Sequence, residues 1–254
     1  MIGYTQALQH YKNIPLGRPE AYGGWEGRSK RSTAEFVHLA SELEKKTPRY
    51  FGVEMELDEN LYIPKLQELI HPFGHVYADG SPASEVVTSP ATLRATKTIV
   101  QRFWRKFKKA GLSHKPKRHL GSHIHFSGSP KHMEVARFIN LRTNNPFTTL
   151  VAQRPENGAC YRFSDADMVY RSEFSKGAAC STLTGHRTTE VRIFRSPKGP
   201  AEVCKNVEFV DALCAYHEET NADDMKVDPF IAWLASHKRP YPHLSTFLKK
   251  EGVL

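Results

Sequence analysis

The segment 50–57 alternates apolar and polar side chains with the two-residue period of a β-strand. One face of that strand would be apolar, and its members are Phe51, Val53, Met55 and Leu57. The other face would carry Glu54 and Glu56, about 6.5 to 7 Å apart. Two carboxylates at that spacing repel each other, whereas a divalent cation near both would turn the repulsion into binding energy. The pattern therefore predicts a strand with a core face and a face suited to a cation.

Two later segments repeat this period with other functional groups. In 119–127, His123 and His125 would share one face, and in 188–194 Glu190 and Arg192 would do the same. The apolar side chains between them are Ile124, Phe126, Val191 and Ile193. Each pair alone fits the polar outer face of an antiparallel sheet. Together they contain no lysine, which is unusual for a solvated face, so we expect the three segments to form one site.

Two further acidic residues lie between the segments 50–57 and 119–127. Glu85 stands directly before Val86 and Val87, in a predicted strand over 85–88, and Asp79 lies a few residues earlier. Carboxylate oxygens with one imidazole suit Mg²⁺ or Mn²⁺ better than a structural zinc site. An arginine beside such a site suits phosphate, because the guanidinium donates two parallel hydrogen bonds and keeps its charge.

Four motifs, taken in order, resemble those of the amidoligase family of carboxylate-amine ligases, which is similar to glutamine synthetase and glutamate-cysteine ligase. They are Phe51-Gly52-Val53-Glu54-Met55-Glu56-Leu57, Asp79-Gly80-Ser81 with Glu85-Val86-Val87-Thr88-Ser89-Pro90, Gly121-Ser122-His123-Ile124-His125, and Thr189-Glu190-Val191-Arg192-Ile193-Phe194. The resemblance implies an α+β fold: a curved, mostly antiparallel sheet with helices packed on one face, as in the catalytic fold of glutamine synthetase. It also implies ATP and Mg²⁺ or Mn²⁺ as cofactors. On this basis we expect an N-terminal arm with a helix over 1–49, a catalytic domain over 50–220 and a C-terminal helical extension over 221–254, packed on the same domain.

The same resemblance implies roles for individual residues. The metal ligands would be Glu54, Glu56, Glu85, His125 and Glu190. His123 and Asp79 are further candidates for metal or phosphate, and the choice between the two histidines stays open because Leu120-Gly121-Ser122 replaces the Cys-Gly-Leu that often precedes them in the family. Arg192 would be the catalytic residue that neutralises the transferring γ-phosphate, and Arg195 and Lys198 would contact the nucleotide phosphates. The implied activity joins a carboxylate to an amine, neither of which the sequence identifies.

The positive charge of the chain is local. Lys and Arg number 36 against 27 Asp and Glu, and ten of the basic residues fall within 91–119, which has no acidic residue. Apolar residues recur there at steps of three and four, so the segment predicts an amphipathic helix with a basic outer face. The basic side chains from Arg94 to Arg118 allow a polyanionic or nucleic-acid partner. One alternative function is therefore a nucleic-acid-binding or catalytically degenerate protein that uses this segment.

A second alternative is an enzyme of the 2H phosphoesterase type. His125-Phe126-Ser127 and His186-Arg187-Thr188 both fit the H-x-[S/T] pattern of that class. This alternative leaves Glu54, Glu56 and Glu190 without a role.

Several classes are excluded by what the sequence lacks. The longest apolar run, 230–235, is too short to cross a bilayer, and no apolar segment follows Met1, so we expect a cytoplasmic protein without a membrane partner. The four cysteines have no CxxC spacing, which favours reduced thiols. A GxxxxGK[ST] phosphate loop is also missing, which excludes P-loop kinases.

Overall fold

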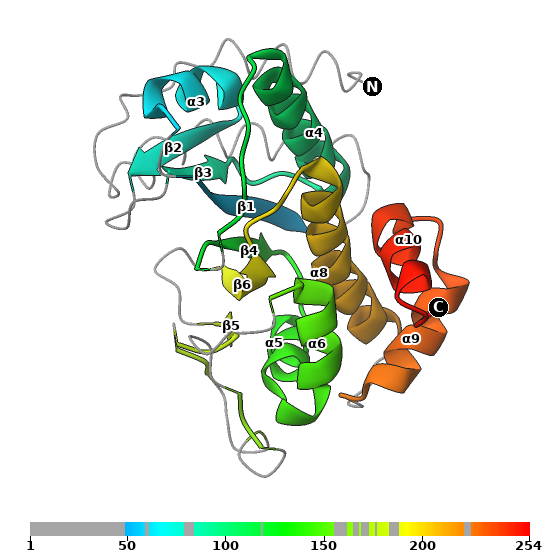
Figure 1. Ribbon diagram of the computed structural model, residues 1–254. Coiled ribbons are helices and arrows are strands. Elements are labelled where there is room, and N and C mark those ends of the chain that lie inside the picture. Colours follow the sequence, from blue (N-terminus) through cyan, green and yellow to red (C-terminus); the bar gives the residue numbers. More distant parts are fainter. Residues whose placement is uncertain are drawn as a thin grey trace, which may run out of the picture.

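The computed structural model describes residues 49–58, 61–78, 84–117, 119–154, 162–164, 168, 173–175, 177–182, 188–220 and 225–254. These residues form an open antiparallel sheet with helices packed against it (Figure 1). The sheet has six strands in the order β2-β3-β1-β4-β6-β5, and every neighbouring pair is antiparallel. The strands are β1 (Tyr50–Leu57), β2 (Gly74–Ala78), β3 (Ser84–Thr88), β4 (Gly121–Ser127), β5 (Cys180–Ser181) and β6 (Thr189–Arg195). The N-terminal arm expected over 1–49 lies almost entirely outside the described residues.

The helices are interspersed with the strands along the chain. They are α3 (Ile63–Ile70), α4 (Leu93–Lys109), α5 (His132–Asn140), the short 3-10 turn η1 (Arg142–Asn144), α6 (Asn145–Ala152), α8 (Pro200–Thr220), α9 (Val227–Ser236) and α10 (Pro242–Lys250). In Figure 1, α9 and α10 lie together on one side of α8, and α5 and α6 lie side by side on its other side. None of the described helices combines the length and the apolar composition that a membrane crossing requires.

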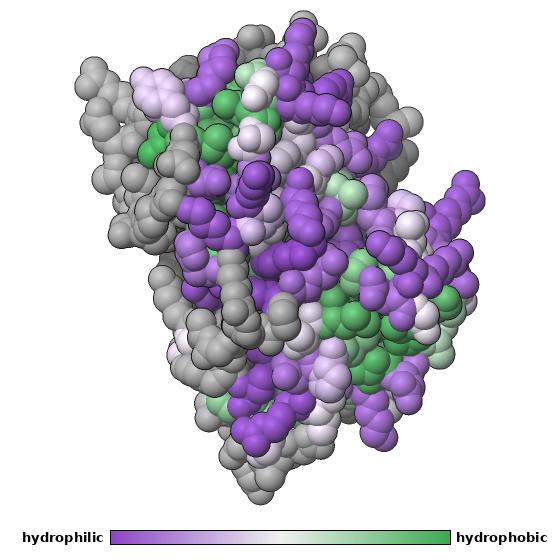
Figure 2. All heavy atoms as spheres, viewed as in Figure 1, coloured by the Kyte–Doolittle hydropathy of each residue, from purple (hydrophilic) through white to green (hydrophobic). Residues whose placement is uncertain are grey.

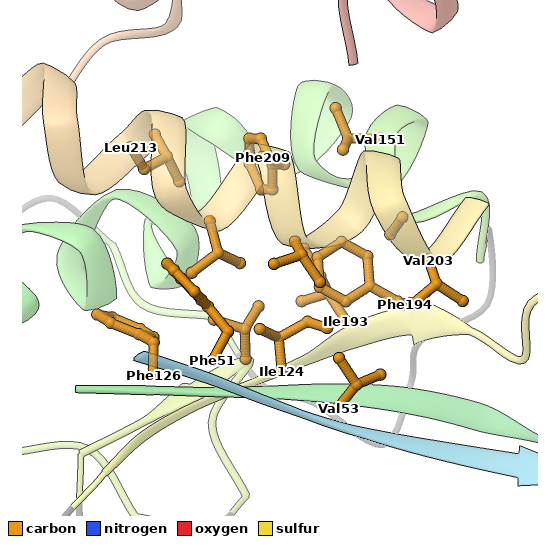
Figure 3. Packing of buried hydrophobic residues seen from close by; sticks show 14 of the residues in the cluster. Phe51, Val53, Ile124, Phe126, Val151, Ile193, Phe194, Val203, Phe209 and Leu213 are labelled. Carbon is orange, nitrogen blue, oxygen red and sulfur yellow. The ribbon is translucent and has the colours of Figure 1, made fainter. Parts of the chain in front are cut away.

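The core lies between the apolar face of the sheet and α8. In Figure 3, Val203, Phe209 and Leu213 of α8 lie over the side chains that the central strands contribute, which include Phe51, Val53, Ile124, Phe126 and Ile193. All of these side chains are fully buried. Burial of this apolar surface contributes about 25 cal/mol for each Å² removed from water, and it is the main contribution that stabilises α8 on the sheet. It also leaves the opposite face of the central strands for polar residues.

Helix α8 is buried on all sides over residues 203–217. It therefore carries charged side chains into the interior, and each needs a partner there. The carboxylate of Glu208 contacts Lys97 Nζ at 2.5 Å, His243 Nδ1 at 2.8 Å and the backbone N–H of Leu244 at 2.9 Å. These contacts connect α8 to both α4 and α10. The C-terminal helices consequently pack on the same body as the sheet.

The expected elements occur with small differences at their ends. The alternation at 50–57 is β1, and the strand expected from 119 begins at Gly121. The sequence also predicts helices over 64–70 and 200–216, and in the structure the first begins one residue earlier, at Ile63, and the second extends to Thr220. Strand β2 is not predicted by the sequence, and α6 lies within 143–187, where the sequence predicts long loops and short strands.

Candidate metal centre

The register of three strands brings the predicted site residues together. Glu54 on β1 lies opposite His123 on β4, and His125 on β4 lies opposite Glu190 on β6. Neighbouring residues of each strand, such as Val53 and Ile124, point into the core, so the four functional side chains share the other face of the sheet. The two-residue period seen in the sequence thus becomes one cluster in space.

A β-bulge shapes the β6 side of this cluster. Ser122 pairs with Phe194 and Ile124 with Val191, so two steps along β4 span three steps along β6. Strand β6 therefore contains one extra residue, which changes the phase of its alternation. As a result Ile193 and Phe194 are both fully buried, although they are neighbours in the sequence.

Distances within the cluster are those of direct contacts. His123 Nδ1 lies 3.0 Å from Glu54 Oε2 and 3.3 Å from Glu190 Oε1. His125 Nε2 lies 3.0 Å from Glu54 Oε1 and 3.8 Å from Glu190 Oε1. One potential ligand atom each from Glu54, His123 and Glu190 lies within 4.8 Å of the other two. This is the distance range in which three side chains can bind a single cation.

Charges in the cluster stabilise one another. Burial favours a raised pKa for Glu54, but hydrogen bonds and charge interactions with His123 and His125 outweigh it and hold this pKa well below its usual value. Burial alone would lower the pKa of His125, yet its hydrogen bond to Glu54 and the charges of Glu54 and Glu190 raise it. The Arg192 guanidinium contacts the Glu190 carboxylate on the same face. Glu54 and Glu190 are thus each in contact with basic side chains whose place a bound cation would take in part.

A second pair of carboxylates lies beside this cluster. Glu56 and Glu85 are directly opposite each other in the β1–β3 register, and Glu85 is buried. Glu56 Oε2 accepts a hydrogen bond from Gly121 N at 2.5 Å, and its Oε1 lies 3.9 Å from His123 Nε2. Like charges directly across two strands destabilise a sheet unless a cation or a proton compensates them. This arrangement suits a second cation next to the first.

The structure does not bring every candidate to this face. The guanidinium of Arg195 is paired with Glu202 on α8, at 2.6 Å. Lys198 lines a separate cavity that includes none of the cluster residues. Asp79 lies outside the described residues, and so does His186 of the phosphoesterase alternative.

Two residues beside the site were not predicted. Thr188 Oγ1 lies 2.9 Å from His125 Nδ1 and so orients the imidazole with its Nε2 toward Glu54. Tyr77 on β2 lies opposite Glu85 and thus on the same face as both carboxylate pairs. The alternation of His75 and Tyr77 around Val76 is a signal in the sequence that could have located Tyr77 on this face.

The donor set fits a divalent cation. Glu54 and Glu190 supply carboxylate oxygens, and each imidazole supplies one nitrogen, a combination used for Mg²⁺ and Mn²⁺ and accepted by Zn²⁺. The described cysteines, Cys180, Cys204 and Cys214, are buried elsewhere as free thiols. Burial raises the pKa of all three. They therefore take no part in this centre.

The comparison with solved structures gives weak similarity only, and the sequence comparisons give none. No protein-family model and no curated protein matches the chain. Among solved structures, the complex between the prokaryotic ubiquitin-like protein Pup and its ligase PafA matches with a TM-score of 0.33 and 10% sequence identity. The match covers 66% of this chain and 46% of that chain, so the chain spans less than half the length of the protein it matches. At this level the comparison leaves the functional question to the site itself.

Proposed function

We propose that the protein is an ATP-dependent carboxylate-amine ligase that requires Mg²⁺ or Mn²⁺. The observation that carries the proposal is the convergence of Glu54, His123, His125, Glu190 and Arg192 on one face of an antiparallel sheet. Carboxylates and imidazoles would bind cations there, and the neighbouring arginine would bind phosphate. The same face offers Glu56 and Glu85 for a second cation.

The roles of the residues follow from their positions. Glu54, Glu190 and one of the two histidines would hold one cation, and Glu56 with Glu85 would hold another. When bound, the cations supply positive charge that offsets the charge of the triphosphate. Arg192 would place its guanidinium beside the transferring phosphate, and Glu190 positions that guanidinium through their direct contact.

The proposed reaction has two balanced steps. First, an oxygen of the substrate carboxylate forms a bond to the γ-phosphorus of ATP while the bond from that phosphorus to the β–γ bridging oxygen breaks, and ADP leaves. The product is an acyl phosphate, whose carbonyl carbon is a better electrophile than that of a carboxylate. An amine then forms a bond to this carbon, inorganic phosphate leaves with the electrons of the broken carbon–oxygen bond, and the amine releases one proton.

The nucleic-acid alternative has less support from the structure. Single-stranded nucleic acids stack on exposed aromatic rings. Helix α4 is basic on its outer face, but Phe103, Trp104 and Phe107 are only 1%, 7% and 2% exposed. They pack largely into the core, so none of the three rings is exposed on the basic outer face of α4, where a run of bases would have to stack.

Thermal unfolding with and without ligands tests the proposal. Mn²⁺ alone should raise the Tm, and ATP should raise it further only when Mn²⁺ is present, because a ligand at 100 times its Kd adds about 2.7 kcal/mol to stability. Glu54→Gln should abolish both increments and keep the fold. Glu68→Gln is the matched control, since Glu68 is an exposed glutamate on α3, away from the cluster, whose carboxylate forms an ion pair with Lys65.

The opposite result is equally informative. If ATP with Mn²⁺ stabilises Glu54→Gln as well as it stabilises the native chain, Glu54 does not hold the metal.

A second experiment identifies the substrates. The protein is incubated with pools of carboxylic acids and amines, and ADP release is measured. ADP release that needs an acid, an amine and Mn²⁺ together, and is lost in Glu54→Gln, identifies a ligase.

A further inference from the structure

A cavity of about 430 Å³ lies apart from the metal centre, between the C-terminal half of α4 and the start of α8. Its walls come from α4, from residues 112–114 that follow this helix, and from residues 198–200 that lead into α8. In Figure 2, hydrophilic residues gather over the region of α4. No residue that lines the cavity belongs to the carboxylate and histidine cluster. The volume falls in the range of sites for small molecules.

Three basic side chains line this cavity without a carboxylate partner. Arg105 and Lys108 come from successive turns of α4, and Lys198 comes from the loop before α8. All three are exposed, and among the described residues none of them forms an ion pair. The described residues of the lining include no aspartate or glutamate. Other basic residues nearby are neutralised, as Lys97 is by Glu208 and Lys117 by Asp58.

The charges of the surrounding helices add to this positive field. α8 is 21 residues long and begins at Pro200, in the cavity wall, so the positive end of its dipole lies at the cavity. Glu202 in its first turn is engaged by Arg195 and by the backbone N–H of Lys198. The nearest acidic group on α8 is thus already paired.

The remaining wall is apolar and contains an unsatisfied donor. Trp104, Phe107 and Leu112 supply the apolar surface. Trp104 is 7% exposed, and its indole Nε1 has no hydrogen-bond acceptor in the described part of the chain. A buried N–H without an acceptor is costly and rare in native proteins. Trp104 Nε1 is therefore a donor in this region that the described residues leave without an acceptor.

We propose that this cavity binds an organic phosphate, a small molecule in which a phosphate group with two negative charges is attached to a flat or apolar body. The phosphate would lie among Arg105, Lys108 and Lys198, and the guanidinium can donate two parallel hydrogen bonds to it. The body would lie against Trp104, Phe107 and Leu112. A carboxylate group carries one negative charge and would therefore pair with fewer of these three basic side chains than a phosphate group with two. The proposal stands apart from the ligase activity, because it involves none of the metal-centre residues.

Isothermal titration calorimetry of the full chain in EDTA tests the proposal with phenyl phosphate as the probe. EDTA removes divalent cations, so binding at the metal centre does not contribute. We expect phenyl phosphate to bind at least tenfold more tightly than inorganic phosphate, and phenol not to bind measurably. Affinity should fall as the salt concentration rises, because the contacts are ionic.

Two triple variants with the same loss of charge distinguish a site from a general field. Arg105→Gln, Lys108→Gln and Lys198→Gln together should raise the Kd at least tenfold. The control combines Arg94→Gln, Lys109→Gln and Lys115→Gln, three exposed basic residues outside the cavity lining, and should change the Kd by less than threefold. Equal losses in the two variants, or no binding by the native chain, would overturn the proposal. Glu54→Gln should bind phenyl phosphate normally, so failure of the ligase proposal and failure of this one give different results.

Discussion

Lys205 offers a quantitative test of how burial changes the pKa of an amine and, through it, the stability of the protein. Its side chain is 3% exposed on α8, where its ammonium donates to the backbone carbonyl of Val151 and to Gln153 Oε1 at the C-terminal end of α6. It also lies 4.5 Å from the centre of the Phe247 ring on α10. Burial lowers the pKa of this amine from 10.5 to about 7. The folded state therefore releases a proton that the unfolded chain keeps.

The sign and size of the effect follow from proton linkage. Below pH 7 the amine is charged in both states, and above pH 10.5 it is neutral in both, so only the interval between these values matters. Within it the unfolded chain binds more protons, and stability rises with pH. For pKa values of 10.5 unfolded and about 7 folded, the free energy of unfolding should rise by about 2.7 kcal/mol from about pH 6 to about pH 9.

Urea denaturation of the native chain and of Lys205→Met at both pH values measures this contribution. The difference in unfolding free energy between the two proteins cancels all other titrations, and it should shift by about 2.7 kcal/mol in favour of the native chain at the higher pH. Lys250→Met, which removes an exposed lysine from the end of α10, should show no such shift. A difference for Lys205→Met that does not change with pH would refute the reasoning.

Two other predictions concern the candidate site and the strand beside it. The contacts of His125 with Glu54 raise the pKa of this imidazole, so protons compete with a metal up to a higher pH than they do at an ordinary histidine. The Tm increase caused by Mn²⁺ should therefore be larger at about pH 8 than at about pH 6. An equal increase at both pH values would contradict the assignment of His125 as a ligand. Asn140→Ala should lower the free energy of unfolding by about 2–4 kcal/mol, measured by urea denaturation, because Asn140 donates to Cys180 O at 2.7 Å and accepts from Cys180 N at 2.9 Å. A loss well below 1 kcal/mol would show that β5 does not depend on these two bonds.

The sequence predicted the strands of the site because their chemistry has a simple period. Alternation at 50–57 and around His123 and His125 placed apolar and functional groups on opposite faces, as the structure has them. It could not predict register, because period two says nothing about which residue of one strand lies opposite which residue of another. That Glu54 meets His123 became apparent only from the structure. The roles of these residues in metal binding and catalysis stay predictions.

The sequence did not predict which charged residues of α8 are buried, for a different reason. Lys205, Glu208 and Asp211 on α8 look like the solvated positions of a helix, yet all three are buried. Their partners lie far along the chain: Arg49 and Tyr241 for Asp211, and Lys97 and His243 for Glu208. Only tertiary packing decides that such groups meet.

The extra residue in β6 has a consequence for how the strand can change in length. Before it, Val191 pairs with Ile124, and after it, Phe194 pairs with Ser122. Removing Ile193 would leave both of these pairings in place, whereas removing a residue from β1 or β4 would exchange the inward and outward side chains of half the strand. The lengths of β1 and β4 are therefore fixed by the alternation that separates their buried face from the face of the cluster, and β6 is the one strand of the three that has an extra residue to lose.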